Sequence, residues 1–240
     1  MRLSLLFIRK TKANFIRLGL HVFVKPFESA LLNLVYLSKL SQWHRHQPKV
    51  AYNDFYNATF NANNRFKLYA SILESEKLNA PINYLEFGVR EGSTFKWWVE
   101  NNQSAESKFD GFDTFEGLPE DWNNYKAGEM SVGGKFPAIN DNRISFHKGL
   151  FQDTLWNFLK KFNDDKRKVI HIDSDLYTSA LFVLTSLAPL LKKNDVIIFD
   201  EFGVPQHEFL VYDEFIRSFR IPLKMIGACN NYLHVAFVVE

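Results

Sequence analysis

The stretch NYLEFGVREGSTFKWW, residues 83–98, decides the fold. It opens with an apolar run typical of a strand buried on both faces. Two glycines, Gly88 and Gly92, bracket the turn that follows, and Ser93 or Thr94 can cap a helix that runs through the aromatic residues at the end. A strand, a glycine loop and a helix N-terminus in this order predict the first ligand-binding turn of a doubly wound α/β fold.

The spacing of this turn is Glu86-x-Gly88-x-x-x-Gly92, which differs from the G-x-G-x-x-G of dinucleotide-binding proteins. An acid two residues before the first glycine favours a cationic or hydroxylated ligand over a pyrophosphate. The alternative is a glycine turn that serves only close packing.

Strand and helix patterns alternate along the rest of the chain. They predict a mostly parallel, seven-stranded sheet with helices on both faces, a C-terminal antiparallel hairpin and one antiparallel edge strand. The expected strands are 83–87, 108–113, 144–147, 168–175, 195–200, 223–227 and 233–239, and the expected helices include 154–162, 179–191 and 208–220. Residues 52–64 suggest a loop or short helix, and the long polar insertion 117–137 is typical of a lid or substrate loop.

Composition indicates a single domain with an extension. The chain has 240 residues, of which 46% are hydrophobic and 16% aromatic, and this is ample for a core. Cys229 is the only cysteine, so the sequence allows no intrachain disulfide and fits a reducing, cytoplasmic setting.

Charge separates the chain into an N-terminal arm, residues 1–47, and a body, residues 48–240. The first 48 residues hold eight Lys or Arg and only Glu28 as an acid, a net charge of +7, so the remaining residues carry −5. A mildly acidic body argues against a nucleic-acid groove across it.

The arm contains a basic segment, 15–24, and an apolar helix, 29–40, but no uninterrupted membrane span and no secretory signal. One interpretation is peripheral contact with a membrane surface. The other, favoured because polar and apolar positions are not cleanly separated, is packing on its own domain or on a partner subunit in a homo-oligomer.

Acidic residues end four of the expected strands. They are Glu86, Asp113, Asp173 with Asp175, and Asp200 with Glu201. Ligands of such sheets sit outside the carboxyl ends of the strands, so these acids are expected to share one site. Asp113, 21 residues after Gly92, is placed to accept ribose hydroxyls, although a turn or helix-cap Asp is an equally common role.

Three acids at neighbouring strand ends, Asp173, Asp200 and Glu201, would repel one another unless a cation lies among them. An all-oxygen ligand set indicates a hard ion, Mg²⁺ or Ca²⁺. The alternative is that some of these acids cap helices while another is a free base.

Five motifs together resemble the class I S-adenosylmethionine-dependent methyltransferases, and within them the macrocin O-methyltransferase type, which methylates sugar hydroxyls. They are YLEFGVREGS (84–93), FDTFEGLPEDW (112–122), HKGLFQDTL (147–155), HIDSDLYTS (171–179) and IIFDEFG (197–203). The resemblance covers residues 65–240 and implies a Rossmann-like domain.

The resemblance implies roles for particular residues. Glu86, Gly88 and Gly92 would bind the methionine end of S-adenosylmethionine, Ser93 would also contact this cofactor, and Asp113 would bind its ribose. Asp173, Asp200 and Glu201 would ligate Mg²⁺, which would hold two neighbouring hydroxyls of the sugar. Asp173 or Asp175 would remove the proton. The family usually has Asp-Gly-Asp and Asp-Asp-Tyr where this chain has Ser174 and the pair Glu201-Phe202, which leaves the acceptor open between a glycan, a glycolipid and a natural-product sugar.

Three further residues lie near the expected site. His171 is expected to be a core histidine rather than a second base, His207 is a better site histidine by location, and Tyr177 either positions substrate or packs. Two other functions remain open: an NAD-dependent oxidoreductase, disfavoured by the glycine spacing, and a non-catalytic cofactor-binding or assembly subunit.

Overall fold

The computed structural model describes residues 2–122 and 124–240. The chain divides between Arg45 and His46 into two compact units. The first unit contains α1 (Arg2–Arg17), α2 (His21–Val24), the 3-10 helix η1 (Lys25–Phe27) and α3 (Glu28–His44). No single helix among the described residues has the length and hydropathy of a membrane span, although Leu5–Arg17 and His21–His44, bent by 83°, pass that test as a pair.

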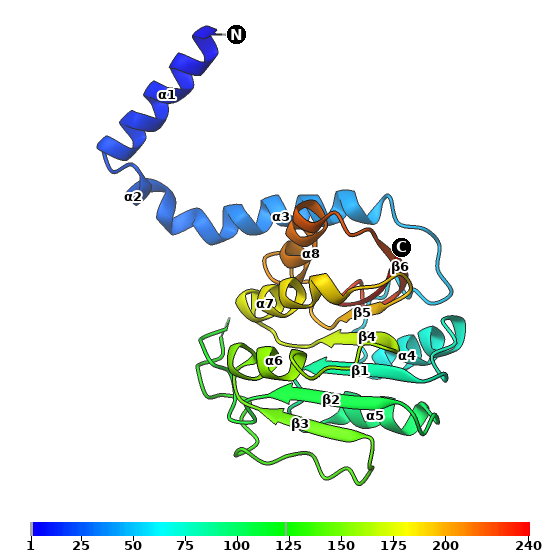
Figure 1. Ribbon diagram of the computed structural model, residues 1–240. Helices are drawn as coiled ribbons and strands as arrows, with labels where there is room; N and C mark the ends of the chain where they lie inside the picture. The colour runs from blue at the N-terminus through cyan, green and yellow to red at the C-terminus, as the bar shows by residue number, and fades with distance from the viewer. Residues whose placement is uncertain (1, 123) are drawn as a thin grey trace. The chain divides into compact units, whose positions relative to one another are not determined.

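The second unit is a three-layer α/β/α domain (Figure 1). Its strands are β1 (Ile82–Phe87), β2 (Lys108–Asp113), β3 (Ile144–Lys148), β4 (Arg167–Ile172), β5 (Val196–Phe199), β6 (Leu223–Cys229) and β7 (His234–Val239). Its helices are α4 (Asn64–Ser75), α5 (Ser93–Asn101), α6 (Phe151–Leu159), α7 (Tyr177–Leu187, continued by η2, Ala188–Leu190) and α8 (Glu208–Phe219).

The seven strands form one sheet in the order β3-β2-β1-β4-β5-β7-β6. The predicted Rossmann-like fold is confirmed, and β1 to β5 are parallel. The antiparallel strand, however, is not at the edge as expected. β7 lies between β5 and β6 and is antiparallel to both, because the second strand of the hairpin, not the first, pairs with β5.

Strand β1 is central and buried along its whole length, as its apolar run predicts. Alternate side chains face opposite layers. On one face the ring of Tyr84 stacks on Trp98 of α5 with ring centroids 5.3 Å apart. On the other face Phe87 stacks on Phe112 of β2 at 4.7 Å and contacts Phe151 of α6. Aromatic packing on both faces therefore fixes β1 between the helical layers (Figure 1).

The start of α5 differs from the sequence expectation. Gly92, not Ser93 or Thr94, occupies the N-cap position, with a left-handed φ of 79° and no side-chain cap. A Cβ on Gly92 would lie 2.7 Å from the ring of Pro137, so a glycine is required there for packing as well. The hydroxyl of Thr94 instead donates to Glu86 at 2.7 Å, which ties the helix to the end of β1.

Candidate active site

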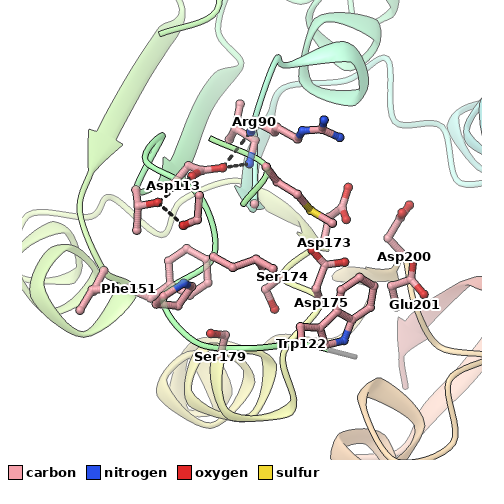
Figure 2. A pocket seen from close by; sticks show the side chains of 18 of the residues that line it. Arg90, Asp113, Trp122, Phe151, Asp173, Ser174, Asp175, Ser179, Asp200 and Glu201 are labelled. Carbon is pink, nitrogen blue, oxygen red and sulfur yellow. Dashed lines mark hydrogen bonds between the residues drawn. The ribbon is translucent and has the colours of Figure 1, made fainter. Parts of the chain in front are cut away.

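A cavity of about 600 Å³ opens at the carboxyl ends of the parallel strands (Figure 2). Its wall combines the glycine loop 88–91, the turn 113–114 after β2, the insertion from residue 117, the turn 149–152 after β3, and the acids that follow β4 and β5. Because chain order reverses beside β1 and β4, this is the topological switch point where α/β sheets bind ligands.

The glycine loop is held from both sides. Gly88 has φ +99°, and a Cβ on it would lie 1.7 Å from the carbonyl oxygen of Asp173, so only glycine fits between β1 and β4. On the other side Oδ2 of Asp113 accepts the backbone N–H groups of Val89 and Arg90, both at 2.8 Å. The cavity wall includes Gly88 and Asp113, as the resemblance implies.

Asp113 therefore has a structural role in addition to the ribose binding that the resemblance implies. Its second oxygen, Oδ1, accepts the backbone N–H of Phe115 at 2.6 Å. A carboxylate has about four acceptor positions, and the hydroxyl of Thr114, 3.5 Å from Oδ1, approaches the fourth, so Asp113 chiefly holds the loop and the turn. Figure 2 shows Asp113 and Phe151 on one side of the cavity and the strand-end acids on the other.

Glu86 does not line the cavity, and this corrects the expectation that it contacts the cofactor. Its side chain is completely buried. It accepts hydrogen bonds from Thr94 and from the hydroxyl of Tyr84, and lies 3.5 Å from Nδ1 of His171. The acid thus links β1 to the start of α5 and to β4. Gly92 also lies outside the wall, whereas Ser93 is part of it.

The acids after β4 and β5 gather at one end of the cavity, where Figure 2 shows Asp173, Asp175, Asp200 and Glu201 close together. Burial and the charge of Asp200 raise the pKa of Asp173 well above its usual range. The same two causes raise the pKa of Asp175 to about 6 and that of Glu201 to about 8. Asp173, Asp175 and Glu201 therefore have too little positive charge near them to stabilise their ionised forms.

Asp200 is the exception. Burial alone would raise its pKa, but His234, His171 and Arg65 hold it well below its usual range. Nδ1 of His234 lies 3.0 Å from Oδ1, and the guanidinium of Arg65 lies 3.3 Å from Oδ2. Hydrogen bonds to Asp200 and Glu86 likewise outweigh burial and raise the pKa of His171 to about 10. Asp200 is consequently a buried carboxylate whose negative charge is stabilised by neighbouring side chains.

The residues present fit a divalent ion in part. Ligand atoms of His171, Asp173 and Asp200 lie within 4.8 Å of one another, and the excess carboxyl groups beside them are oxygen donors of the kind that Mg²⁺ prefers. Both ring nitrogens of His171 already face Tyr84 and Glu86 or Tyr69 and Asp200. His171 therefore orients Asp200 rather than acting as a ligand. Glu201 is not within that group of three.

Besides Nε of Arg65, two polar groups in the cavity wall lack a hydrogen-bond partner in the described structure. They are Oγ of Ser174, which stands between the two aspartates after β4, and Nε1 of Trp122 in the insertion. Trp122 also stacks on Tyr125, with ring centroids 5.5 Å apart and an interplanar angle of 13°. Buried polar groups normally have partners, so these two are available to a bound ligand.

The other residues singled out from sequence lie outside the wall. His171 is a fully buried core histidine, as expected. The hydroxyl of Tyr177 donates to Glu214 of α8 at 2.6 Å, which indicates packing of α7 on α8. His207 precedes α8 and contacts Trp122 edge to face, and burial lowers its pKa.

Sequence analysis missed Arg65 and His234, which hold Asp200. Arg65 lies in the first turn of α4 and His234 begins β7, and no local pattern marks either residue. Only the closing of the sheet by β7 and the packing of α4 bring them to the end of β5.

Residues 85–202 match a protein-family model, Methyltransf_24, described as a methyltransferase domain. The match contains the glycine loop, Asp113 and all four strand-end acids of the cavity. Combined with the doubly wound sheet and its C-terminal hairpin, it identifies the protein as a class I methyltransferase, an enzyme that uses S-adenosylmethionine. No curated protein matches the sequence significantly.

Solved structures share the fold at low sequence identity. Calicheamicin methyltransferase CalS11 is 20% identical over 85% of this chain and 91% of its own, with a TM-score of 0.60. A second CalS11 structure, without ligand and described as a TDP-rhamnose 3′-O-methyltransferase, is 19% identical over 74% and 80%, with a TM-score of 0.51. A structure of cmcI described as Mg-SAM is 16% identical over 84% of each chain, with a TM-score of 0.52.

Proposed function

We propose that the protein is an O-methyltransferase that methylates a sugar hydroxyl with the assistance of Mg²⁺. The observation that carries this proposal is the excess of half-buried carboxyl groups, Asp173, Asp175 and Glu201, in the same cavity as the glycine loop. A cation at that end would relieve the repulsion that raises their pKa values.

The two ends of the cavity have different tasks in this proposal. The glycine loop, Asp113 and Phe151 bind and orient S-adenosylmethionine, whose sulfonium supplies an electrophilic methyl group. Asp173 or Asp175, at the other end, takes the proton of the attacking hydroxyl, because both carboxyl groups line the cavity where the acceptor would bind. Binding of the cofactor at one end and of the acceptor at the other brings the reacting atoms together and excludes water.

The metal ligands in this proposal are Asp173, Asp200 and Glu201. Asp173 and Asp200 already have oxygens close together, and Glu201 follows Asp200 directly. A bound Mg²⁺ supplies Lewis-acid stabilisation of the developing alkoxide. His234, His171 and Arg65 keep Asp200 ionised despite its burial, and the ionised form is the one that ligates a metal.

A sugar acceptor is supported by the chemistry of the wall. The stacked rings of Trp122 and Tyr125 offer an apolar surface for the C–H face of a sugar, while Ser174 and the indole N–H offer hydrogen bonds to its hydroxyls. The fold of CalS11, described as acting on TDP-rhamnose, is similar.

Calorimetry with S-adenosylhomocysteine, with and without Mg²⁺, tests the cofactor and the metal separately. We expect binding of the cofactor product in both conditions and additional Mg²⁺ binding to the wild type. Asp173→Asn should retain S-adenosylhomocysteine, lose Mg²⁺ binding, and lower kcat/KM for a nucleotide sugar by at least about 100-fold. Unaltered transfer in this variant would rule out the metal mechanism, and failure to bind S-adenosylhomocysteine at millimolar concentration would rule out the function.

A further inference from the structure

The N-terminal unit combines exposed apolar surface with a high positive charge. Large apolar side chains are exposed along all of its helices, among them Phe7 (72%), Phe23 (75%) and Phe27 (61%). Within α2, η1 and α3 no residue is buried at all. The helices of this unit therefore do not bury their own apolar surface, which leaves it available to an external partner.

The charge of the same unit defines that partner. Residues 1–45 carry eight Lys or Arg against one acid, Glu28, so positive charge accompanies the exposed apolar side chains. A second copy of the arm would bring two strongly positive segments together, which is unfavourable. An anionic bilayer surface satisfies both properties, because apolar side chains enter the acyl boundary while Lys and Arg extend to the headgroups.

We propose that residues 5–37 bind the surface of a membrane that contains anionic lipids and thereby hold the methyltransferase at that surface. Exposed apolar residues are distributed over α1, α2, η1 and the first part of α3, and cations such as Arg9, Lys10 and Lys12 lie between them. Each Lys or Arg near an anionic surface adds to the binding, and salt screens that attraction.

Cosedimentation of the full-length protein with vesicles tests this proposal. Vesicles of phosphatidylcholine alone and vesicles with 30% phosphatidylglycerol are compared at low and high salt (~0.1 and ~0.5 M). We expect binding to the anionic vesicles that weakens at high salt. The variant R9E/K10E/K12E should lower the partition coefficient at least about tenfold. The variant F7S/F23S should lower it as well, because it removes inserted apolar surface.

The matched control is K67E/K161E/K193E, which makes the same charge change on exposed lysines of the second unit. It should bind vesicles as the wild type does. All variants must retain binding of S-adenosylhomocysteine, which shows that the methyltransferase domain remains folded. The proposal is overturned if the wild type ignores anionic vesicles or binds neutral ones equally well. It is also overturned if the control loses as much binding as the arm variants, or if light scattering shows that the arm variants change only the oligomeric state.

Discussion

Gly88 shows how a single residue sets the geometry of the site. Its φ of +99° and the 1.7 Å gap between a hypothetical Cβ and the carbonyl oxygen of Asp173 leave no room for a side chain. We expect Gly88→Ala to lower the free energy of unfolding by at least about 3 kcal/mol and to abolish S-adenosylhomocysteine binding. Urea denaturation and calorimetry measure the two effects.

Gly128→Ala is the control for this prediction. Gly128 has a similar φ of +87° but open space around its Cβ position, so this variant introduces backbone strain without overlap. It should cost about 1 kcal/mol. Equal losses in the two variants would show that the contact with Asp173 is unimportant.

Glu201 makes the stability of the metal-free protein depend on pH. Its pKa is raised to about 8 in the folded state by burial and by Asp200 and Asp175. Below the ordinary pKa of a glutamate, both folded and unfolded states hold the proton and there is no penalty. As pH rises towards 8 the unfolded state loses its proton first, so the free energy of unfolding falls.

Glu201→Gln should therefore stabilise the protein at pH 8 by ~2 kcal/mol and have little effect at pH 4, where the carboxyl group is protonated in both states. Thermal or urea unfolding in EDTA at both pH values measures this. Glu74→Gln, an exposed glutamate on α4, should change neither value. A destabilised Glu201→Gln at pH 8 would mean that the carboxylate is compensated in the folded protein.

At the scale of elements, asparagines join two distant loops. Asn231, in the turn between β6 and β7, accepts the backbone N–H of Asn57 at 2.9 Å and donates to its carbonyl oxygen at 2.7 Å. Asn230 makes the same pair of bonds with Asn61, at 3.2 and 3.0 Å. Each side-chain amide thus makes the pair of hydrogen bonds that the backbone of a neighbouring strand would make. Together the two asparagines fix the loop that leads into α4 and Arg65.

Replacing both, N230A/N231A, should lower the free energy of unfolding by about 2 kcal/mol, because four hydrogen bonds are lost and both positions have positive φ. Hydrogen exchange at the amides of Asn57 and Asn61 should accelerate. N230D/N231D keeps the acceptors and the tolerance for positive φ, so it should lose about half as much. Unchanged exchange in the alanine variant would contradict this role of the turn.

Sequence alone predicts the elements whose signals are local. The apolar run of β1, the two glycines after it and the acids at the strand ends all lie within short windows, and the structure brings all of these acids except Glu86 to one cavity. Boundaries and caps were less predictable, because the left-handed Gly92 takes the cap position that Ser93 or Thr94 was expected to fill.

Contacts between distant segments could not be predicted. Glu86 lies at a sequence position typical of a ligand-binding acid. In the structure, however, Tyr84, Thr94 and His171 enclose its carboxylate outside the cavity. Two partners of Asp200, Arg65 and His234, come from α4 and β7, at opposite ends of the domain's sequence. Their roles depend on the order in which the strands assemble, and residue spacing does not specify that order.

At the scale of the whole molecule, the chain separates into two units with different surfaces. The unit His46–Glu240 contains the complete sheet, the buried aromatic core and every residue of the cavity wall. The first unit holds the excess positive charge, and none of its described residues contributes to that core or to the wall. Folding and cofactor binding should therefore depend on the second unit alone.

Deleting residues 1–45 tests this division. We expect the shortened protein to unfold in one cooperative transition and to bind S-adenosylhomocysteine with an affinity within about twofold of the full chain, since no wall residue is removed. Differential scanning calorimetry and titration calorimetry provide the two measurements. A deletion protein that aggregates or loses cofactor binding would show that the first 45 residues complete the domain. In that case their exposed apolar surface would have a structural partner within the enzyme or its oligomer.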